Sequence, residues 1–169
     1  MEENKKTAEE ILKPVNMYQI AARLFASVAE SVIEQFGEAG EAAVVEGVRR
    51  FGEARGRHIA ERAFADGKSN TVENYLEYYD MERSELFTYD TIYRANEIEQ
   101  TFTECVFARQ WQEDGNEKYG MLYCEHIDPS IARGFNANFE VEHDKHFYTD
   151  HVCHFCFKMK DCQKEDHEG

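Results

Sequence analysis

The sequence predicts an α+β fold in which N-terminal helices pack against a four-stranded antiparallel sheet. Two observations lead to this fold class: apolar residues recur every three or four positions in the first half of the chain, and they alternate in two later pairs of segments. The predicted element order is α-α-α-β-β-α-α-β-β, with the helices covering one face or end of the sheet. A length of 169 residues suits a single domain, 1–169, with frayed ends at 1–13 and 161–169.

The first predicted helix covers residues 17–36. Pro14 suits its first turn, and Gly37 suits its end. Its large apolar residues follow the period of one helical stripe, and we expect that stripe to be buried: Ile20, Leu24, Phe25, Val28, Val32, Ile33 and Phe36.

The second predicted helix ends near Gly67 and contains Gly47, Gly52 and Gly56. An internal glycine costs about 1 kcal/mol relative to alanine, so we expect these three to have a packing reason, such as the close approach of another helix. A short third helix is predicted over residues 71–79, capped by Asn70 or Thr71.

The first predicted hairpin begins near residue 86, where the period changes from helical to alternating. One strand covers residues 86–93, a turn follows near Asn96, and the second strand places Ile98, Gln100 and Phe102 on one face. Strict alternation puts Cys105 on the other, more polar face of that strand, at its junction with the next helix.

The region 106–134 is predicted to be helical again, with breaks at Gly115 and at Asp128-Pro129. The last predicted hairpin joins strands 139–148 and 152–160 through a tight turn at 149–151. In this register Cys153 lies opposite Phe147. On the last strand, alternation separates two faces: Cys153, Phe155, Phe157 and Met159 on one, and His154, Cys156 and Lys158 on the other.

The charge of the chain excludes several partners. It carries 19 Lys and Arg against 34 Asp and Glu, a net charge of −15, which repels nucleic acid and anionic membrane surfaces. No apolar run reaches the length of about 20 residues that a membrane span needs. No signal peptide is visible, so we expect a cytoplasmic protein whose five cysteines stay reduced.

The run Cys153-His154-Phe155-Cys156 spells C-x-x-C, which is typical of zinc sites and redox motifs. In a strand, however, positions three apart face opposite sides of the sheet, so the two thiols cannot converge. We therefore expect no cofactor. A partial site for zinc or another divalent metal on cysteine and histidine remains the alternative, as does plain core packing of the cysteines.

One pair, one further thiol and two basic residues stand out as candidate site residues. If residues 124–128 are helical, Cys124 and Asp128 share a face at i, i+4; alternatively, Asp128 caps a helix that starts at Pro129. A helix N-terminus would acidify the thiol of Cys105. Arg55 and His58 lie either on a solvated helix face or inward, where Arg55 could bind a substrate carboxylate.

Several short motifs together carry a family resemblance. The stretch Gly-Glu-Ala-Gly-Glu-Ala-Ala followed by Arg-Arg-Phe-Gly-Glu-Ala-Arg-Gly-Arg-His-Ile-Ala is similar to the second helix of the L-2-amino-thiazoline-4-carboxylic acid hydrolase family. The later order also resembles that family: Thr-Glu-Cys105 with Trp111 shortly after, Leu-Tyr-Cys124 with Asp128, Gly134-Phe135-Asn136, and Asp150 with Cys153-x-Phe155. The resemblance covers roughly residues 35–160.

The resemblance implies a hydrolase that opens a cyclic amidine or thiazoline-type ring by cleaving a C–N or C–S bond. It also implies a cysteine-lined site with Cys105, Cys124, Cys153, Asp128 and Asp150 as catalytic residues. Arg55, His58 and Trp111 would bind the substrate. A cysteine thiolate could attack the ring carbon directly, or a metal held by thiolates could generate hydroxide.

Two other functions remain open. An isomerase or lyase on the same scaffold would suit the twelve Phe and nine Tyr equally well, because function depends on the site rather than the fold. A non-catalytic sensor for a small ligand or metal is the second alternative. In each case the expected partner is a small molecule, and the aromatic content is compatible with a homodimer.

Overall fold

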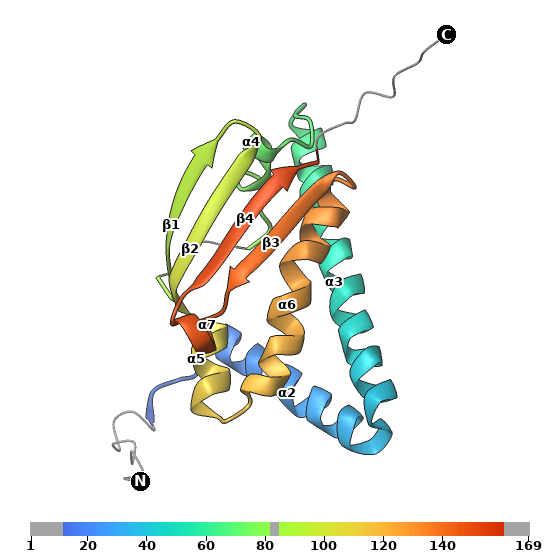
Figure 1. The fold of residues 1–169 in the computed structure, drawn as a ribbon, viewed down its shortest axis with the longest axis vertical. Coiled ribbons are helices and arrows are strands. Elements are labelled where there is room, and N and C mark those ends of the chain that lie inside the picture. Colours follow the sequence, from blue (N-terminus) through green and yellow to red (C-terminus); the bar gives the residue numbers. More distant parts are fainter. Residues whose placement is uncertain (1–11, 82–84, 161–169) are drawn as a thin grey trace.

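A computed structural model describes residues 12–81 and 85–160 and confirms the predicted fold class (Figure 1). Apart from residues 12 and 13, the ends expected to be frayed lie outside the described residues, as does Cys162. The N-terminal helices are α2 (Met17–Phe36), α3 (Glu38–Ala65) and the single turn α4 (Val72–Tyr75). The third helix is thus shorter than the predicted 71–79, with Thr71 as its N-cap.

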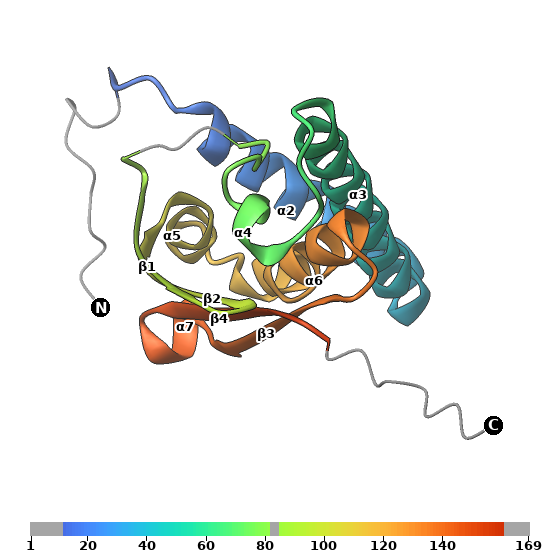
Figure 2. The same cartoon turned by 90° about the horizontal axis from the view of Figure 1, so that it is seen from above.

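The sheet contains two antiparallel hairpins that meet at its centre. Its strands are β1 (Phe87–Arg94), β2 (Glu97–Cys105), β3 (Phe139–Lys145) and β4 (Cys153–Met159), in the order β1-β2-β4-β3. Helices α5 (Val106–Glu113) and α6 (Glu117–Phe135) connect the two hairpins. Helices α2 to α6 lie on one side of the sheet, and none of these five helices covers its other face (Figure 2).

The internal glycines of α3 allow α6 to approach its backbone closely. A Cβ atom on Gly56 would lie 2.1 Å from the carbonyl oxygen of Ile131, and one on Gly52 would lie 2.6 Å from the Cβ of Ser130. The predicted packing reason is therefore confirmed for these two glycines. It is wrong for Gly47, which faces open space.

The predicted break in α6 at Asp128-Pro129 is wrong, because the helix continues through Pro129 to Phe135. The alternative in which Asp128 caps a new helix is therefore wrong as well. Helix α6 packs closely along α3 at Gly52 and Gly56, and this packing offsets the cost of a proline that lacks a backbone N–H. The break at Gly115 is confirmed, since α5 ends at Glu113 and Gly115 has a φ of 69°.

Helix α2 buries a different face from the one its large apolar residues predicted. Its fully buried residues are Ala22, Ala26 and Ala29, whereas Leu24 is 64% and Val28 is 52% exposed. Small side chains let α2 pack closely on α3, α5 and α6, which the larger residues would prevent. Part of the predicted stripe therefore faces outward.

The last hairpin is not closed by a tight turn. Strand β3 ends at Lys145, and a short helix, α7 (Phe147–Asp150), leads into β4 after His151, which has a φ of 59°. The predicted pairing of Cys153 with Phe147 is wrong, because Phe147 belongs to α7 and the pairing of β3 with β4 ends at Lys145 and His154. The carboxylate of Asp150 accepts hydrogen bonds from the backbone N–H of His146 at 2.9 Å and the hydroxyl of Thr149 at 2.7 Å, which stabilises α7.

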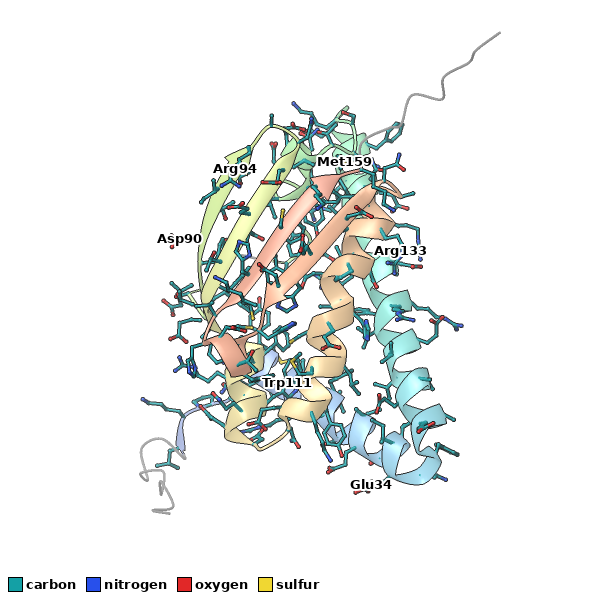
Figure 3. The ribbon with its side chains drawn as sticks, viewed as in Figure 1. Glu34, Asp90, Arg94, Trp111, Arg133 and Met159 are labelled. Carbon is teal, nitrogen blue, oxygen red and sulfur yellow. The ribbon has the colours of Figure 1, made fainter. Side chains whose placement is uncertain are left out.

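The core consists of two apolar clusters. The larger one lies between the sheet and α3, α4 and α6, and the smaller one lies where α2, α5 and α6 meet around Trp111 (Figure 3). Within the described residues, no helix has the length and apolar character required to cross a membrane.

Candidate functional site

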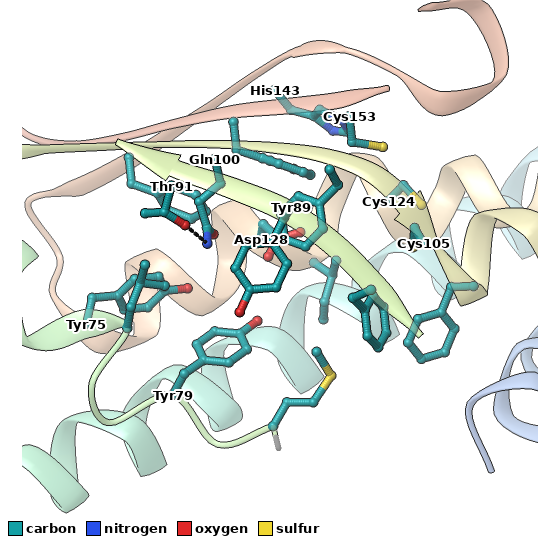
Figure 4. A pocket seen from close by; sticks show the side chains of 18 of the residues that line it. Tyr75, Tyr79, Tyr89, Thr91, Gln100, Cys105, Cys124, Asp128, His143 and Cys153 are labelled. Carbon is teal, nitrogen blue, oxygen red and sulfur yellow. Dashed lines mark hydrogen bonds between the residues drawn. The ribbon is translucent and has the colours of Figure 1, made fainter. Parts of the chain in front are cut away.

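A cavity of about 670 Å³ lies between the inner face of the sheet and the helices that cover it (Figure 4). This volume falls within the range of small-molecule sites. Most of its wall is aromatic, with rings contributed by four helical or loop residues on one side and by strands β1, β2 and β4 on the other: Tyr75, Tyr79, Phe107, Tyr123, Phe87, Tyr89, Tyr93, Phe102, Phe155 and Phe157.

The three cysteines of the family resemblance all line this cavity. Cys105 ends β2, Cys124 lies on α6, and Cys153 begins β4, so residues distant in the sequence meet at one end of the cavity. The thiols of Cys105 and Cys153 both act electrostatically on the pKa of Cys124, so the three thiols lie close together.

A β-bulge brings Cys105 into the cavity. Thr88 pairs with Glu104 and Tyr89 pairs with Phe102, so Thr103 has no partner on β1. The extra residue reverses the alternation that strict period-two reasoning assumes. Cys105 consequently lies opposite Phe87 on the inner face, and its predicted position on the polar face is wrong.

All three thiols are protonated at neutral pH. Burial raises the pKa of Cys153 to about 12 and also raises the pKa values of Cys105 and Cys124. At Cys105 the backbone N–H groups of Phe107 and Ala108 act in the opposite direction, but burial outweighs them. The predicted acidification of Cys105 by the helix N-terminus is therefore wrong in sign.

Asp128 is the acidic group of the inner cavity wall. It lies one turn after Cys124 on the same face of α6, as the i, i+4 spacing predicted. Burial raises the pKa of its carboxyl to about 6, and the nearby positive charge of Arg55 offsets part of this effect. A carboxyl group with such a pKa can accept and return a proton near neutral pH.

Arg55 points inward and lines the cavity, as one of the two sequence interpretations proposed. Its Nε and Nη2 atoms donate to the two carboxylate oxygens of Asp80 at 3.0 and 2.6 Å. The guanidinium also lies over the rings of Phe51 and Tyr79, 5.8 and 5.4 Å from their centroids. The predicted carboxylate clamp is therefore already occupied by a carboxylate of the same chain.

Sequence reasoning missed several polar residues of the cavity. The Tyr75 ring is fully buried and its hydroxyl has no hydrogen-bond partner among the described residues. Gln100 donates to Thr91 at 3.1 Å. The sequence did contain a signal for such residues. Alternation assigns Gln100 to the apolar face of its strand, where a polar side chain is unusual.

His143 carries the same signal on β3. Its ring stacks on Phe155 at 4.1 Å between centroids and lies 4.0 Å from the His146 ring. Burial lowers the pKa of the His143 imidazole to about 4, and the neighbouring His146 adds a smaller effect in the same direction. The imidazole is therefore neutral. Neither ring nitrogen has a hydrogen-bond partner within the described part of the chain, although both are buried.

Three of the predicted site residues lie away from the cavity. Trp111 is buried in the smaller core cluster and donates from Nε1 to the carbonyl of Ala22 at 2.8 Å, so its role is packing. His58 is exposed on α3 because the next residue, Ile59, takes the inward position. Asp150 is exposed and stabilises α7.

The two cysteines of the C-x-x-C run point to opposite faces of β4, as predicted. Cys153 is buried and lines the cavity, whereas Cys156 pairs with Glu99 and Glu142 on the outer part of the sheet. Among residues 12–81 and 85–160, no group of three or more His, Cys, Asp or Glu side chains is arranged to hold a metal ion.

Of the comparisons with known proteins, the family model supports the predicted family, and the solved structure shows the fold alone. No curated protein matches the sequence. A solved structure, described as a trafficking protein particle complex subunit 3 from Naegleria fowleri covalently bound to palmitic acid, shares the fold with a TM-score of 0.53 and 15% identity, covering 85% of this chain and 95% of that one. The model of the L-2-amino-thiazoline-4-carboxylic acid hydrolase family matches residues 17–157, so the chain belongs to this family.

Proposed function

We propose that the chain is a hydrolase that opens the ring of a cyclic amidine-type small molecule, with the aromatic cavity as its active site. The observation that supports this most is the meeting of Asp128 with Cys105, Cys124 and Cys153 in one cavity of substrate size. Membership of the hydrolase family supports the reaction class.

Asp128 is the proposed acid–base group. Its ionised carboxylate takes a proton from a water molecule as the water oxygen bonds to the ring carbon between the two heteroatoms. The bond from this carbon to the ring sulfur or nitrogen then breaks, and Asp128 returns the proton to the leaving heteroatom. The net reaction is the addition of one water molecule, and Asp128 ends in its starting state.

The cysteines act in this proposal as neutral thiols that shape the end of the cavity. Direct attack by a thiolate is the other route that the resemblance implies. The raised thiol pKa values oppose it, because a pKa of about 12 at Cys153 leaves very little thiolate at neutral pH. Asp128 has a pKa of about 6 and is a weak base toward such a thiol, so activation of water is favoured.

The test is the appearance of a product one water molecule heavier than the substrate. The purified protein is incubated with L-2-amino-thiazoline-4-carboxylic acid and with 2-amino-thiazoline, and products are identified by mass spectrometry. Replacing Asp128 by Asn should lower kcat at least about 100-fold, the usual contribution of an acid–base group. Glu125→Gln is the matched control, since Glu125 is exposed on the same helix.

Two results would count against this mechanism. Asp128→Asn with full activity would remove the acid–base role. The second result combines two observations: one of the single Cys→Ser variants at residues 105, 124 and 153 abolishes turnover, and the wild type forms a covalent adduct with the substrate. Attack by a thiolate would then replace activation of water by Asp128.

A second candidate function is the binding of a fatty acyl chain. The aromatic wall of the cavity favours it, and the similar solved structure is described as covalently bound to palmitic acid. Incubation with palmitoyl-CoA would then add one palmitoyl group to a thiol and release free CoA. Intact-mass measurement before and after hydroxylamine treatment, together with the Cys→Ser variants, checks this. An unchanged mass would exclude covalent acylation.

A further inference from the structure

We propose that the substrate is a cyclic amidine that carries no carboxylate group, and that Asp80 sets this preference by occupying the guanidinium of Arg55. This inference rests on the proposed function and names the substrate class of that site. It differs from the namesake substrate of the family, which is an acid.

The first step is the charge of the cavity wall. Among the described residues that line it, Arg55 is the cation, while Asp128 and Glu77 are acidic. His143 is neutral because burial lowers the pKa of its imidazole to about 4. An anionic substrate would therefore enter a site in which Arg55 is its sole attractive charge.

The second step is the state of that charge. Asp80 binds two of the three guanidinium nitrogens of Arg55, and both side chains are largely buried, with exposures of 16% for Arg55 and 13% for Asp80. The rings of Phe51 and Tyr79 lie on the guanidinium and fix its position. Arg55 therefore cannot turn away from Asp80 to meet a ligand without breaking a buried bidentate ion pair.

The third step concerns the remaining nitrogen. The bonds to Asp80 use Nε and Nη2, and within the described part of the chain no hydrogen bond is found for Nη1. Because Arg55 lines the cavity, Nη1 is the guanidinium nitrogen left for a ligand. A carboxylate at this nitrogen would form a single contact beside the negative charge of Asp80. An uncharged acceptor atom would meet the same N–H without that repulsion.

The fourth step is what the rest of the wall offers. The hydroxyl of Tyr75 and the ring nitrogens of His143 are buried without partners among residues 12–81 and 85–160, and Asp128 supplies an acceptor. Buried polar groups without partners are rare in proteins, which points to a ligand that completes them. An amidine, which carries no negative charge and is cationic when protonated, donates N–H groups to the Asp128 carboxylate, and its remaining ring heteroatom is an acceptor for the hydroxyl of Tyr75.

The test compares two probes that differ only in the carboxylate. 2-Amino-thiazoline and L-2-amino-thiazoline-4-carboxylic acid are titrated into the wild-type protein by calorimetry at neutral pH. We expect the probe without the carboxylate to bind at least tenfold more tightly. Equal affinities, or tighter binding of the acid, would overturn the inference.

A variant tests the role of Asp80 directly. Asp80→Asn keeps the shape of the side chain and releases the charge of Arg55, so the Kd of the acid should fall about tenfold while that of 2-amino-thiazoline changes little. Glu53→Gln is the matched control: Glu53 pairs with Arg133 at 3.1 Å outside the cavity, so both Kd values should stay the same. A folded Asp80→Asn protein with an unchanged Kd for the acid would contradict the role of Asp80. If this variant does not fold, the wild-type comparison decides.

Binding and turnover are measured separately so that the two proposals can fail independently. Selective binding of 2-amino-thiazoline without product would uphold the charge preference and count against the hydrolase. Hydrolysis of both probes with tighter binding of the acid would uphold the hydrolase and overturn the charge preference.

Discussion

The carboxyl group of Asp128 has an unusual environment for an acid, because helix α6 holds it in a wall made mainly of aromatic rings and protonated thiols. Burial favours its neutral form, while Arg55, already paired with Asp80, compensates only in part. The same environment that makes Asp128 a suitable base also makes its charged form costly. Both effects can be measured.

The first prediction is the pH dependence of the reaction. Because the base form of Asp128 is required, kcat/KM for a hydrolysed probe should rise with pH through a pKa of about 6 and level off above it. Initial rates at low substrate concentration over a series of buffers check this. A rate that is independent of pH across this range would contradict the assignment.

The second prediction concerns stability. The folded-state pKa of Asp128 is raised from 3.8 to about 6, so its contribution to stability is fully present below the unfolded pKa and is lost as pH rises through 6. Asp128→Asn avoids this loss and should increase the free energy of unfolding at pH 7 by about 3 kcal/mol.

Urea denaturation at pH 7 and again near pH 4 checks the second prediction. The gain should disappear at the lower pH, where the wild-type carboxyl is protonated in both states. Glu125→Gln, on the exposed side of the same helix, should show little gain at pH 7. An equal gain at both pH values would point to a cause other than ionisation.

At the scale of elements, the contact between α3 and α6 positions the site. Helix α3 supplies Arg55, and α6 supplies Cys124 and Asp128. Their close approach depends on Gly52 and Gly56 on α3, and on Gly134, where a Cβ would lie 2.3 Å from the carbonyl oxygen of Glu53. The distance between Arg55 and Asp128 therefore depends on these glycines, which lie outside the cavity.

The third prediction uses two glycines of the same helix. Gly56→Ala should lower the free energy of unfolding by about 2 kcal/mol, because its Cβ would overlap the α6 backbone. Gly47→Ala should raise it by up to about 1 kcal/mol, since the site is open and alanine favours a helix. Chemical denaturation measures both. The same sign for both variants would contradict the proposed packing.

At the scale of the whole molecule, α2 presents an apolar outer face. Met17, Ile20, Leu24 and Val28 are 72%, 45%, 64% and 52% exposed. The segment from Met17 to Ala29 contains no Asp or Glu, although the chain carries 34. A second copy of the chain could contact this face without the repulsion that a net charge of −15 creates elsewhere. We therefore predict that a homodimer would form through the outer face of α2.

The fourth prediction tests that location by mass in solution. The wild-type protein should sediment as a dimer of the 19.7 kDa chain at micromolar concentration, and Leu24→Lys should shift it to monomer. Phe64→Lys is the control, because Phe64 is 80% exposed near the C-terminal end of α3. A wild-type protein that is monomeric at every concentration would exclude this dimer.

The faces of the strands and the existence of most helices followed from local periodicity. Alternation placed Cys153 and Phe155 on the inner face of β4 and His154 and Cys156 on the outer face, and the structure agrees. This works because the direction of a side chain along a regular strand depends only on backbone geometry. The same reasoning failed at Cys105, where the bulge at Thr103 reverses the pattern.

The α+β class, the family and the residue types available to the cavity follow from the amino-acid order, because each of these depends on local period or on motif order. The tertiary structure alone decided which groups meet. It paired Arg55 with Asp80, 25 positions apart, brought Asp128 into a wall that raises its pKa, and buried the alanine face of α2. These outcomes depend on packing between distant segments, which local periodicity does not encode.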